Sequence, residues 1–298
     1  MRIKFNRKTK GETIFDLLNV IVMCIICFVT VYPIWYTLVN SLNDAADAVK
    51  GGIYWWPRII SVENYKTVFR SPGITTAMIV TVAKTILGTV THVFFTAMVA
   101  YAFSKKELIG RKIYIGMGIV TMFFSGGLIP SYLLLRELHL LDNFFVYIIP
   151  TMFSFFNLVI FMSFFRGIPN SLEESARIDG AYDFMIFIKI ILPVSLPVLA
   201  TIALFQGVFQ WNDYFSGVMY ITRKTELVPI QTYLYKIITQ TGANSMMANM
   251  PDNIAKNKVS SQSIKLATMV VTTFPIVCVY PFLQKYFVKG MLIGAVKG

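Results

Sequence analysis

Residues 169–193 read PNSLEESARIDGAYDFMIFIKIILP, and the order of side chains in this stretch indicates a short helix followed by a turn. Ser171 precedes Glu174 by three residues, which is the spacing of a capping box. In that motif two side chains satisfy free backbone N–H groups at the start of a helix. Gly180 can end the helix, because glycine readily adopts the left-handed conformation of a helix end. The first half of the stretch is therefore expected to form one capped helix.

The second half of the stretch predicts another helix, from about residue 182 to residue 192. Pro193 is expected to stop it, because proline cannot donate the hydrogen bond of an interior helical turn. Four residues around the turn have small side chains, which let another surface approach closely; they are Ser175, Ala176, Gly180 and Ala181. The whole stretch is predicted to form two helices joined by a turn.

Long apolar runs lie on both sides of this stretch. A membrane-spanning helix needs about 20 mostly apolar residues. Six runs qualify, at about 14–38, 74–103, 113–135, 144–165, 196–220 and 264–287. The first is too long for a secretory signal and lacks a small-residue cleavage site, so it is expected to be retained. The sequence predicts an all-α, polytopic membrane protein with six transmembrane helices, a terminal segment 1–13 and a single transmembrane domain over 14–298.

The composition agrees with a lipid environment. Of the 298 residues, 56% are hydrophobic and only 14% are charged. Soluble domains average about 25% charged residues. The net charge of +12 would also suit a nucleic-acid binder. The basic residues, however, sit in short clusters between the apolar runs, which is how membrane topology is encoded, so no nucleic-acid partner is expected.

The distribution of lysine and arginine predicts the orientation. The leading segment, the loops after the second and fourth runs and the tail together hold fifteen basic residues, against ten in the longer segments on the other side. Loops rich in lysine and arginine stay in the cytoplasm. Both termini are therefore expected inside. Lys84 lies about ten residues into the second run, and its long side chain is expected to extend to the outer surface.

Catalytic motifs are missing from the sequence. It contains no glycine-rich loop ending in Gly-Lys-Ser/Thr and no His-Glu-x-x-His pair. His92 and His139 are far apart, and Cys24, Cys27 and Cys278 lie in apolar runs, so no metal site is predicted. If the protein uses ATP, another subunit must bind it.

The stretch 169–193 resembles the "EAA loop" of type I ABC importer permeases, which has the form Glu-Ala-Ala, three residues, Gly, nine residues, Ile-x-Leu-Pro. Here Glu174-Ser175-Ala176 is followed by Gly180 and by Ile190-x-Leu192-Pro193 at the same spacing. Ser175 replaces the first alanine, one small residue for another. The resemblance implies that this loop supplies the coupling helix that docks on an ATPase subunit, with Glu174, Ser175, Ala176, Asp179 and Gly180 at the contact.

Other segments extend the resemblance over essentially the whole chain. They are Gly51-Gly52-x-Tyr54-x-Trp56-Pro57, Ala100-Tyr101-Ala102-Phe103, Phe124-Ser125-Gly126-Gly127-Leu128-Ile129-Pro130 and the tail from Gly290 to Gly298. They are similar to the second permease of maltose-type importers, in the branch that takes up oligosaccharides from polysaccharides. The resemblance implies a bacterial cytoplasmic membrane protein with a second permease, two ATPases that hold ATP and Mg²⁺, and an extracytoplasmic sugar-binding protein.

Polar residues in the fifth run are candidates for a sugar path, because polar groups inside a bilayer are costly and tend to be functional. Gln206, Gln210 and Asp213 are spaced so that one helix face would carry them. Asn212 adds another amide, Trp211 an aromatic ring for sugar stacking, and Asn157 in the fourth run a further amide. The same amides are equally suited to bridging helices, and Trp211 to an interfacial belt.

Three other functions are compatible with a six-span protein. A secondary transporter or channel would need no ATPase, although no run shows a paired-charge array. A membrane enzyme would need a nucleophile or a metal cluster, which the sequence does not show. A pure assembly subunit would bind the ATPase while its partner permease holds the sugar.

Overall fold

The computed structural model describes residues 9–48, 50–71, 73–246 and 262–279, and these residues form helices and turns without a β-strand. The expected all-α architecture is confirmed. Predictions for residues 1–8, for the part of the sixth run after residue 279 and for the tail from Gly290 to Gly298 fall outside these residues. The helices are α1 Lys10–Ser41, α2 Ala45–Ala48, α3 Glu63–Arg70, α4 Ile74–Ser104, α5 Arg111–Phe123, α6 Leu128–Glu137, η1 Phe144–Tyr147, η2 Ile149–Thr151, α7 Phe155–Phe165, α8 Asn170–Ile178, α9 Asp183–Ile186, η3 Phe187–Ile191, α10 Leu192–Val194, α11 Leu196–Asn212, α12 Phe215–Tyr220, η4 Thr225–Leu227, α13 Ile230–Met246 and a last helix Gln262–Val279.

Six spans can be formed by the described residues. Three helices are each long and apolar enough to cross a bilayer: α1, α4 and the helix Gln262–Val279. Three bent pairs supply the others, with a bend of 113° between α5 and α6, 50° between Phe144–Thr151 and α7, and 83° between Asp183–Val194 and α11. Half of the spans are therefore interrupted.

The third span, predicted over 113–135, consists of two helices. The first ends at Phe123 and the second begins at Leu128. Gly127, just before the second helix, has φ 87°, a conformation that glycine adopts without steric cost. The segment Ser125-Gly126-Gly127 therefore turns the chain between the two helices.

The predicted stop at Pro193 is wrong by two residues. The helix continues through Pro193 to Val194, and the chain bends at Ser195. The five residues Phe187–Ile191 before the proline form a π-helical turn. Such a turn shifts the hydrogen-bonding partners, so the missing N–H of proline does not interrupt a regular ladder.

The chain divides into two compact units: residues up to Ser71 together with Ile238–Val271, and the remainder. In the first unit α1 begins with a capping box, in which Thr9 and Glu12 exchange side-chain to backbone hydrogen bonds. Beyond its other end, Arg58 donates to the Asp47 carboxylate at 2.8 Å. The hydrogen bond from Asn43, followed by that from Arg58, lowers the pKa of Asp47. These contacts order the loop that follows α1.

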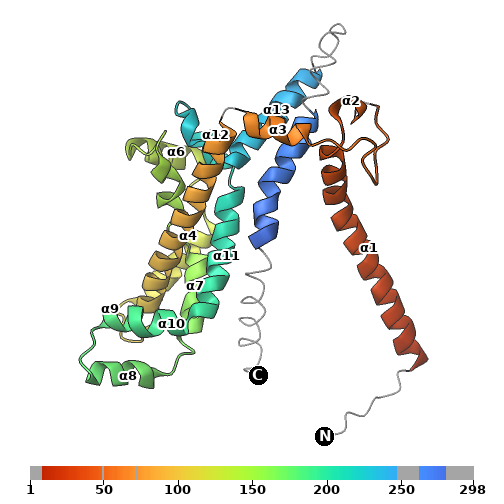
Figure 1. Cartoon of the computed structure of the whole chain (residues 1–298). Helices are drawn as coiled ribbons and strands as arrows, with labels where there is room; N and C mark the ends of the chain where they lie inside the picture. Colours follow the sequence, from red (N-terminus) through yellow and green to blue (C-terminus); the bar gives the residue numbers. More distant parts are fainter. Residues whose placement is uncertain (1–8, 49, 72, 247–261, 280–298) are drawn as a thin grey trace. The chain divides into compact units, whose positions relative to one another are not determined.

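In the second unit α4 packs along both α7 and α11 (Figure 1). The packed core at this junction includes Ala97, Leu158, Phe161 and Phe187, each at most 1% exposed. Small residues such as Ala97 let the helices approach closely, which is how helices associate where lipid removes the hydrophobic driving force. The bundle α4–α7–α11 is the frame that positions both candidate sites below.

Candidate functional site

The short helix α8 lies beyond the ends of α4, α7 and α11, next to α9 and α10 (Figure 1). It begins at Asn170 after Pro169, and no side chain caps it. Ser171 is already inside the helix, where its carbonyl accepts a hydrogen bond from the Ser175 hydroxyl at 2.8 Å. The predicted capping box of Ser171 and Glu174 is therefore wrong. Because the helix already begins at Asn170, Ser171 lies inside its first turn and cannot be the N-cap.

The other end of α8 is fixed by Gly180, as the sequence predicts. Gly180 has φ 81° and donates its N–H to the carbonyl of Arg177. The next residue, Ala181, donates to the carbonyl of Ala176. These two bonds make a Schellman motif, which satisfies the last carbonyls of a helix and requires a left-handed residue. The turn between α8 and α9 is thus defined by backbone geometry.

The two faces of α8 differ in exposure. Leu172, Glu174, Ser175, Ile178 and Asp179 are exposed, with Ile178 at 86%. Ala176 is buried against the protein's own core. Of the five predicted coupling residues, four (Glu174, Ser175, Asp179 and Gly180) are thus available to a partner and Ala176 faces inward. Their role in coupling stays a prediction.

The inward face of α8 carries a contact that the sequence analysis missed. Glu173 forms an ion pair with Lys105, which directly follows α4, and accepts a hydrogen bond from the Tyr101 hydroxyl at 3.3 Å. The Lys105 ammonium also lies over the Tyr101 ring, at 4.2 Å from the ring centroid. The signal in the sequence was the adjacent pair Glu173-Glu174, whose members point in different directions on a helix.

The spacing of Gln206, Gln210 and Asp213 puts them on one side of α11. Gln206 and Gln210 are buried inside the bundle, and Asp213, the residue that caps α11, has a side chain that is only 10% exposed. Gln210 packs against Gly88 of α4, and Asp213 pairs with Lys84, one helical turn away on α4. Asn212 is exposed and donates to a carbonyl within its own helix. The sugar-path role itself stays a prediction.

Gln210 and Asn157 belong to a buried network that joins three helices of the second unit. The Gln210 amide donates to the carbonyl of Tyr147 at 3.0 Å and to the hydroxyl of Thr151 at 2.8 Å. The Thr151 carbonyl lies 2.6 Å from Nδ1 of His92, and Asn157 lies 2.8 Å from Nε2. A carbonyl only accepts, so Nδ1 carries the proton and Nε2 accepts from Asn157. The network bridges α4, α7 and α11 through the broken segment before α7.

Lys84 has a buried partner and does not extend to the surface. Its side chain is fully buried, and its ammonium donates to the carbonyl of Asp213 at 2.9 Å and to the Asp213 carboxylate at 3.3 Å. The ring of Tyr147 lies 4.8 Å from the ammonium. The predicted extension to the outer surface is wrong, because the unwound end of α11 brings a carboxylate and a carbonyl to the lysine.

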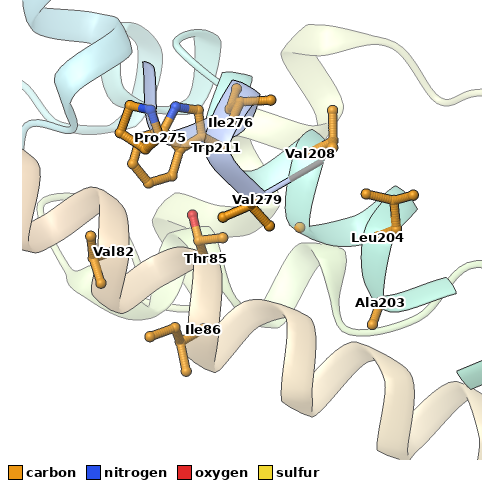
Figure 2. A pocket seen from close by; sticks show the side chains of 11 residues that line it. Val82, Thr85, Ile86, Ala203, Leu204, Val208, Trp211, Pro275, Ile276 and Val279 are labelled. Carbon is orange, nitrogen blue, oxygen red and sulfur yellow. The ribbon is translucent and has the colours of Figure 1, made fainter. Parts of the chain in front are cut away.

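Trp211 lines an apolar cavity of about 180 Å³ between α4, α11 and the helix Gln262–Val279 (Figure 2). Its indole N–H donates to the carbonyl of Thr272 at 3.0 Å. Among the lining side chains only Thr85 and Trp211 carry polar atoms. A sugar site needs several convergent polar groups. This cavity therefore suits an alkyl chain better than a sugar.

Each of the two glutamines of α11 has one polar atom without a hydrogen-bond partner among the described residues: Nε2 of Gln206 and Oε1 of Gln210. Gln210 packs so closely that a Cβ on Gly88 of α4 would lie 2.5 Å from its amide nitrogen. These glutamines therefore keep unused hydrogen-bonding capacity inside a tight helix contact. Both remain candidates for contacts in a different state of the bundle.

Comparison with known proteins gives a consistent result. The family described as "Binding-protein-dependent transport system inner membrane component" matches residues 2–293. The protein LplC of Bacillus subtilis is 38% identical over 290 residues, which cover 97% of each chain. The polygalacturonan/rhamnogalacturonan transport system permease protein YtcP of Bacillus subtilis is 38% identical over 285 residues, covering 96% of this chain and 99% of the relative.

A solved structure is similar over almost the full length. It is a chain of a bacterial ABC transporter involved in the import of the acidic polysaccharide alginate. The TM-score is 0.85 at 31% identity, and the match covers 95% of this chain and 99% of that chain. The broken third, fourth and fifth spans thus occur in a chain whose fold is that of an importer component.

Proposed function

We propose that this chain is one permease subunit of an ATP-driven oligosaccharide importer in a bacterial cytoplasmic membrane. It belongs to the family of binding-protein-dependent transport system inner membrane components, which matches residues 2–293. The polygalacturonan/rhamnogalacturonan permease and the alginate importer support a sugar substrate. Both take up material from acidic polysaccharides, so the substrate class we favour is an oligosaccharide that contains uronic acids.

The proposed coupling role rests on the exposed face of α8. It presents Leu172 and Ile178 as apolar anchors, with Glu174 and Asp179 beside them. Leu172 and Ile178 lie six residues apart, near the two edges of this exposed face, so a groove on a partner that takes up the whole face would contact both. We propose that this partner is an ATPase subunit that holds ATP and Mg²⁺, which this chain does not bind itself.

The transport cycle that we propose is alternating access. ATP closes the pair of ATPase subunits, α8 moves with them, and this chain and a second permease open outward to receive the sugar from an extracytoplasmic binding protein. Hydrolysis reverses the movement. The rigid Schellman turn at Gly180 supports this role, since a defined turn transmits a displacement that a flexible loop would absorb.

The test is purification from native membranes in mild detergent, followed by mass spectrometry and an ATPase assay. A second permease and an ATPase subunit should co-purify, and the binding protein with sugar should stimulate ATP hydrolysis. Ile178→Glu places a charge on the docking face and should reduce ATPase recovery on the order of tenfold. Ile109→Glu, at a residue that is 90% exposed in the loop after α4, is the matched control and should retain it.

The alternative function predicts a different result. A secondary transporter would be recovered alone, folded and active without nucleotide, and Ile178→Glu would then behave like Ile109→Glu. Stimulation by oligogalacturonides but not by neutral oligosaccharides would support the acidic substrate class. Stimulation by neutral sugars alone would contradict that class and leave the permease role intact.

A further inference from the structure

The inward face of α8 is attached to the bundle at two places, one apolar and one polar. Ala176 packs into the core cluster that contains Tyr101 of α4. Glu173, three residues earlier and so on the same helix face, meets Lys105. The apolar contact is small, because alanine offers a single methyl group. The polar contact is therefore the larger attachment of this face.

The polar contact is a three-membered cluster. The Glu173 carboxylate pairs with the Lys105 ammonium and accepts the Tyr101 hydroxyl, and the ammonium covers the Tyr101 ring at 4.2 Å. Tyr101 and Lys105 are four residues apart, so both project from the end of α4. Each member thus touches the other two, and the cluster is fixed from three directions.

The environment of the ion pair makes it stronger than a surface pair. The side chains of Lys105 and Glu173 are only 23% and 19% exposed. Attraction between opposite charges grows as water is withdrawn, and removal of one partner leaves the other charge poorly solvated. The neighbouring pair Arg177–Asp183 is 55% and 71% exposed, and such pairs contribute little. Of the two ion pairs of this loop, Lys105–Glu173 is therefore the one suited to transmit force.

The helix that receives this force is continuous. α4 has 31 residues without a break, a length of about 46 Å. Towards its other end it holds Asp213 through Lys84, and in between it holds Thr151 and Asn157 through His92. A displacement of the α4 end at Lys105 is thus passed to the unwound end of α11 and to the broken fourth span.

We propose that the cluster Tyr101–Lys105–Glu173 is the latch that fastens the coupling helix α8 to α4, so that Glu173 and Lys105 are positioning residues for the coupling of ATP hydrolysis to transport. The inference rests on the proposed function and adds which residues carry the movement inward. Glu174 contacts the ATPase on the outward face, and its neighbour Glu173 holds α8 to its own bundle.

The first test measures sugar transported per ATP hydrolysed in the reconstituted complex. Glu173→Gln keeps the shape and removes the charge; it should lower this ratio on the order of tenfold while the ATPase still co-purifies. Lys105→Glu should do the same, and Lys105→Glu with Glu173→Lys should recover most of the loss. Asp183→Asn removes the exposed pair and should leave the ratio unchanged. A normal ratio in Glu173→Gln, or no recovery in the exchanged pair, would overturn the latch.

The second test reads the latch without transport. Spin labels at Ser171→Cys on α8 and Val90→Cys on α4, both exposed positions outside the proposed docking residues, report the distance between the two helices after Cys24, Cys27 and Cys278 are replaced by serine. In the native background the distance distribution should stay narrow with and without ATP, and Glu173→Gln should broaden it. Equal distributions would overturn the latch even if the wild-type complex couples ATP to transport. An uncoupled wild type with a broadened Glu173→Gln distribution would instead contradict the proposed function alone.

Discussion

At the scale of single residues, buried polar side chains determine how the bundle is joined. Lys84 is the strongest case, because an ammonium inside a membrane protein is tolerated only with partners at hand. It has two oxygen atoms of Asp213 and the face of Tyr147. The carboxylate of Asp213 also accepts a hydrogen bond from the N–H of Ser216, at 3.0 Å, in the first turn of α12 after the break. One lysine therefore fixes the point where α11 ends.

Removal of Lys84 should destabilise the protein, because it leaves the charge of Asp213 unpaired. Lys84→Met should lower the free energy of unfolding by about 3 kcal/mol, because the Asp213 carboxylate is left without its counter-charge in a site where it is only 10% exposed. Lys84→Met combined with Asp213→Asn should recover more than half of the loss. Denaturation in mixed micelles measures both.

Lys66→Ala is the control for that series, since Lys66 and Glu63 are 55% and 61% exposed and form a surface pair. Its effect should stay below about 1 kcal/mol. A double variant no more stable than Lys84→Met alone would show that the pair contributes nothing beyond the volume of the lysine.

At the scale of elements, breaks in helices are as informative as the helices. Glycine ends α8 and precedes α6, and a π-helical turn carries the chain through Pro193. Each break leaves carbonyls or N–H groups that the bundle uses: the carbonyls of Tyr147 and Thr151 serve Gln210 and His92. Irregular backbone at membrane depth is tolerated where it is buried in protein in this way.

Substitutions of Gly180, in the turn after α8, can distinguish a requirement for a left-handed backbone conformation from a requirement for a small side chain. Nothing lies within 4 Å of a Cβ at Gly180, but its φ of 81° strains most side chains. Gly180→Ala should therefore destabilise the turn by about 1 kcal/mol and reduce sugar-stimulated ATP hydrolysis, whereas Gly180→Asn should retain more activity, because asparagine tolerates this conformation. Equal loss in both variants would show that the docking partner excludes any side chain here.

At the scale of the whole molecule, the fold and the orientation in the membrane rest on different observations. The fold is shown by the 0.85 TM-score to a chain of the alginate importer. The orientation of the spans rests on the basic loops. In the orientation that we propose, α8 faces the cytoplasm and the loop around Ile60 faces outward.

Cysteine labelling tests that orientation. In a chain whose own three cysteines are replaced by serine, Ile60→Cys should react with a membrane-impermeant maleimide in intact cells. Ile109→Cys, in the basic loop after α4 and away from the proposed docking face, should react only after the membrane is opened. Both positions are highly exposed, at 76% and 90%, so access to the reagent is limited by the membrane alone. The reverse pattern would place the termini outside and contradict an ATPase contact at α8.

The amino-acid sequence alone determined the class of the protein, the positions of its apolar runs and the importance of the stretch 169–193. These features depend on composition, run length and local spacing, which a chain carries in its order of residues. It also determined the end of α8, because a glycine turn is a property of neighbouring residues. The predictions that failed at this level, for the Ser171 cap and the stop at Pro193, each assumed ideal local helix geometry.

Only the tertiary structure decided where the polar side chains point. Lys84 and Asp213 are 129 residues apart, and Lys105 and Glu173 are 68 apart. The sequence does not show which distant segments pack together, so Lys84 was assigned to the surface and Glu173 was overlooked. A buried charge takes whichever partner the fold brings within reach, because leaving it unpaired is too costly. The contacts that join the coupling helix to the bundle therefore follow from packing.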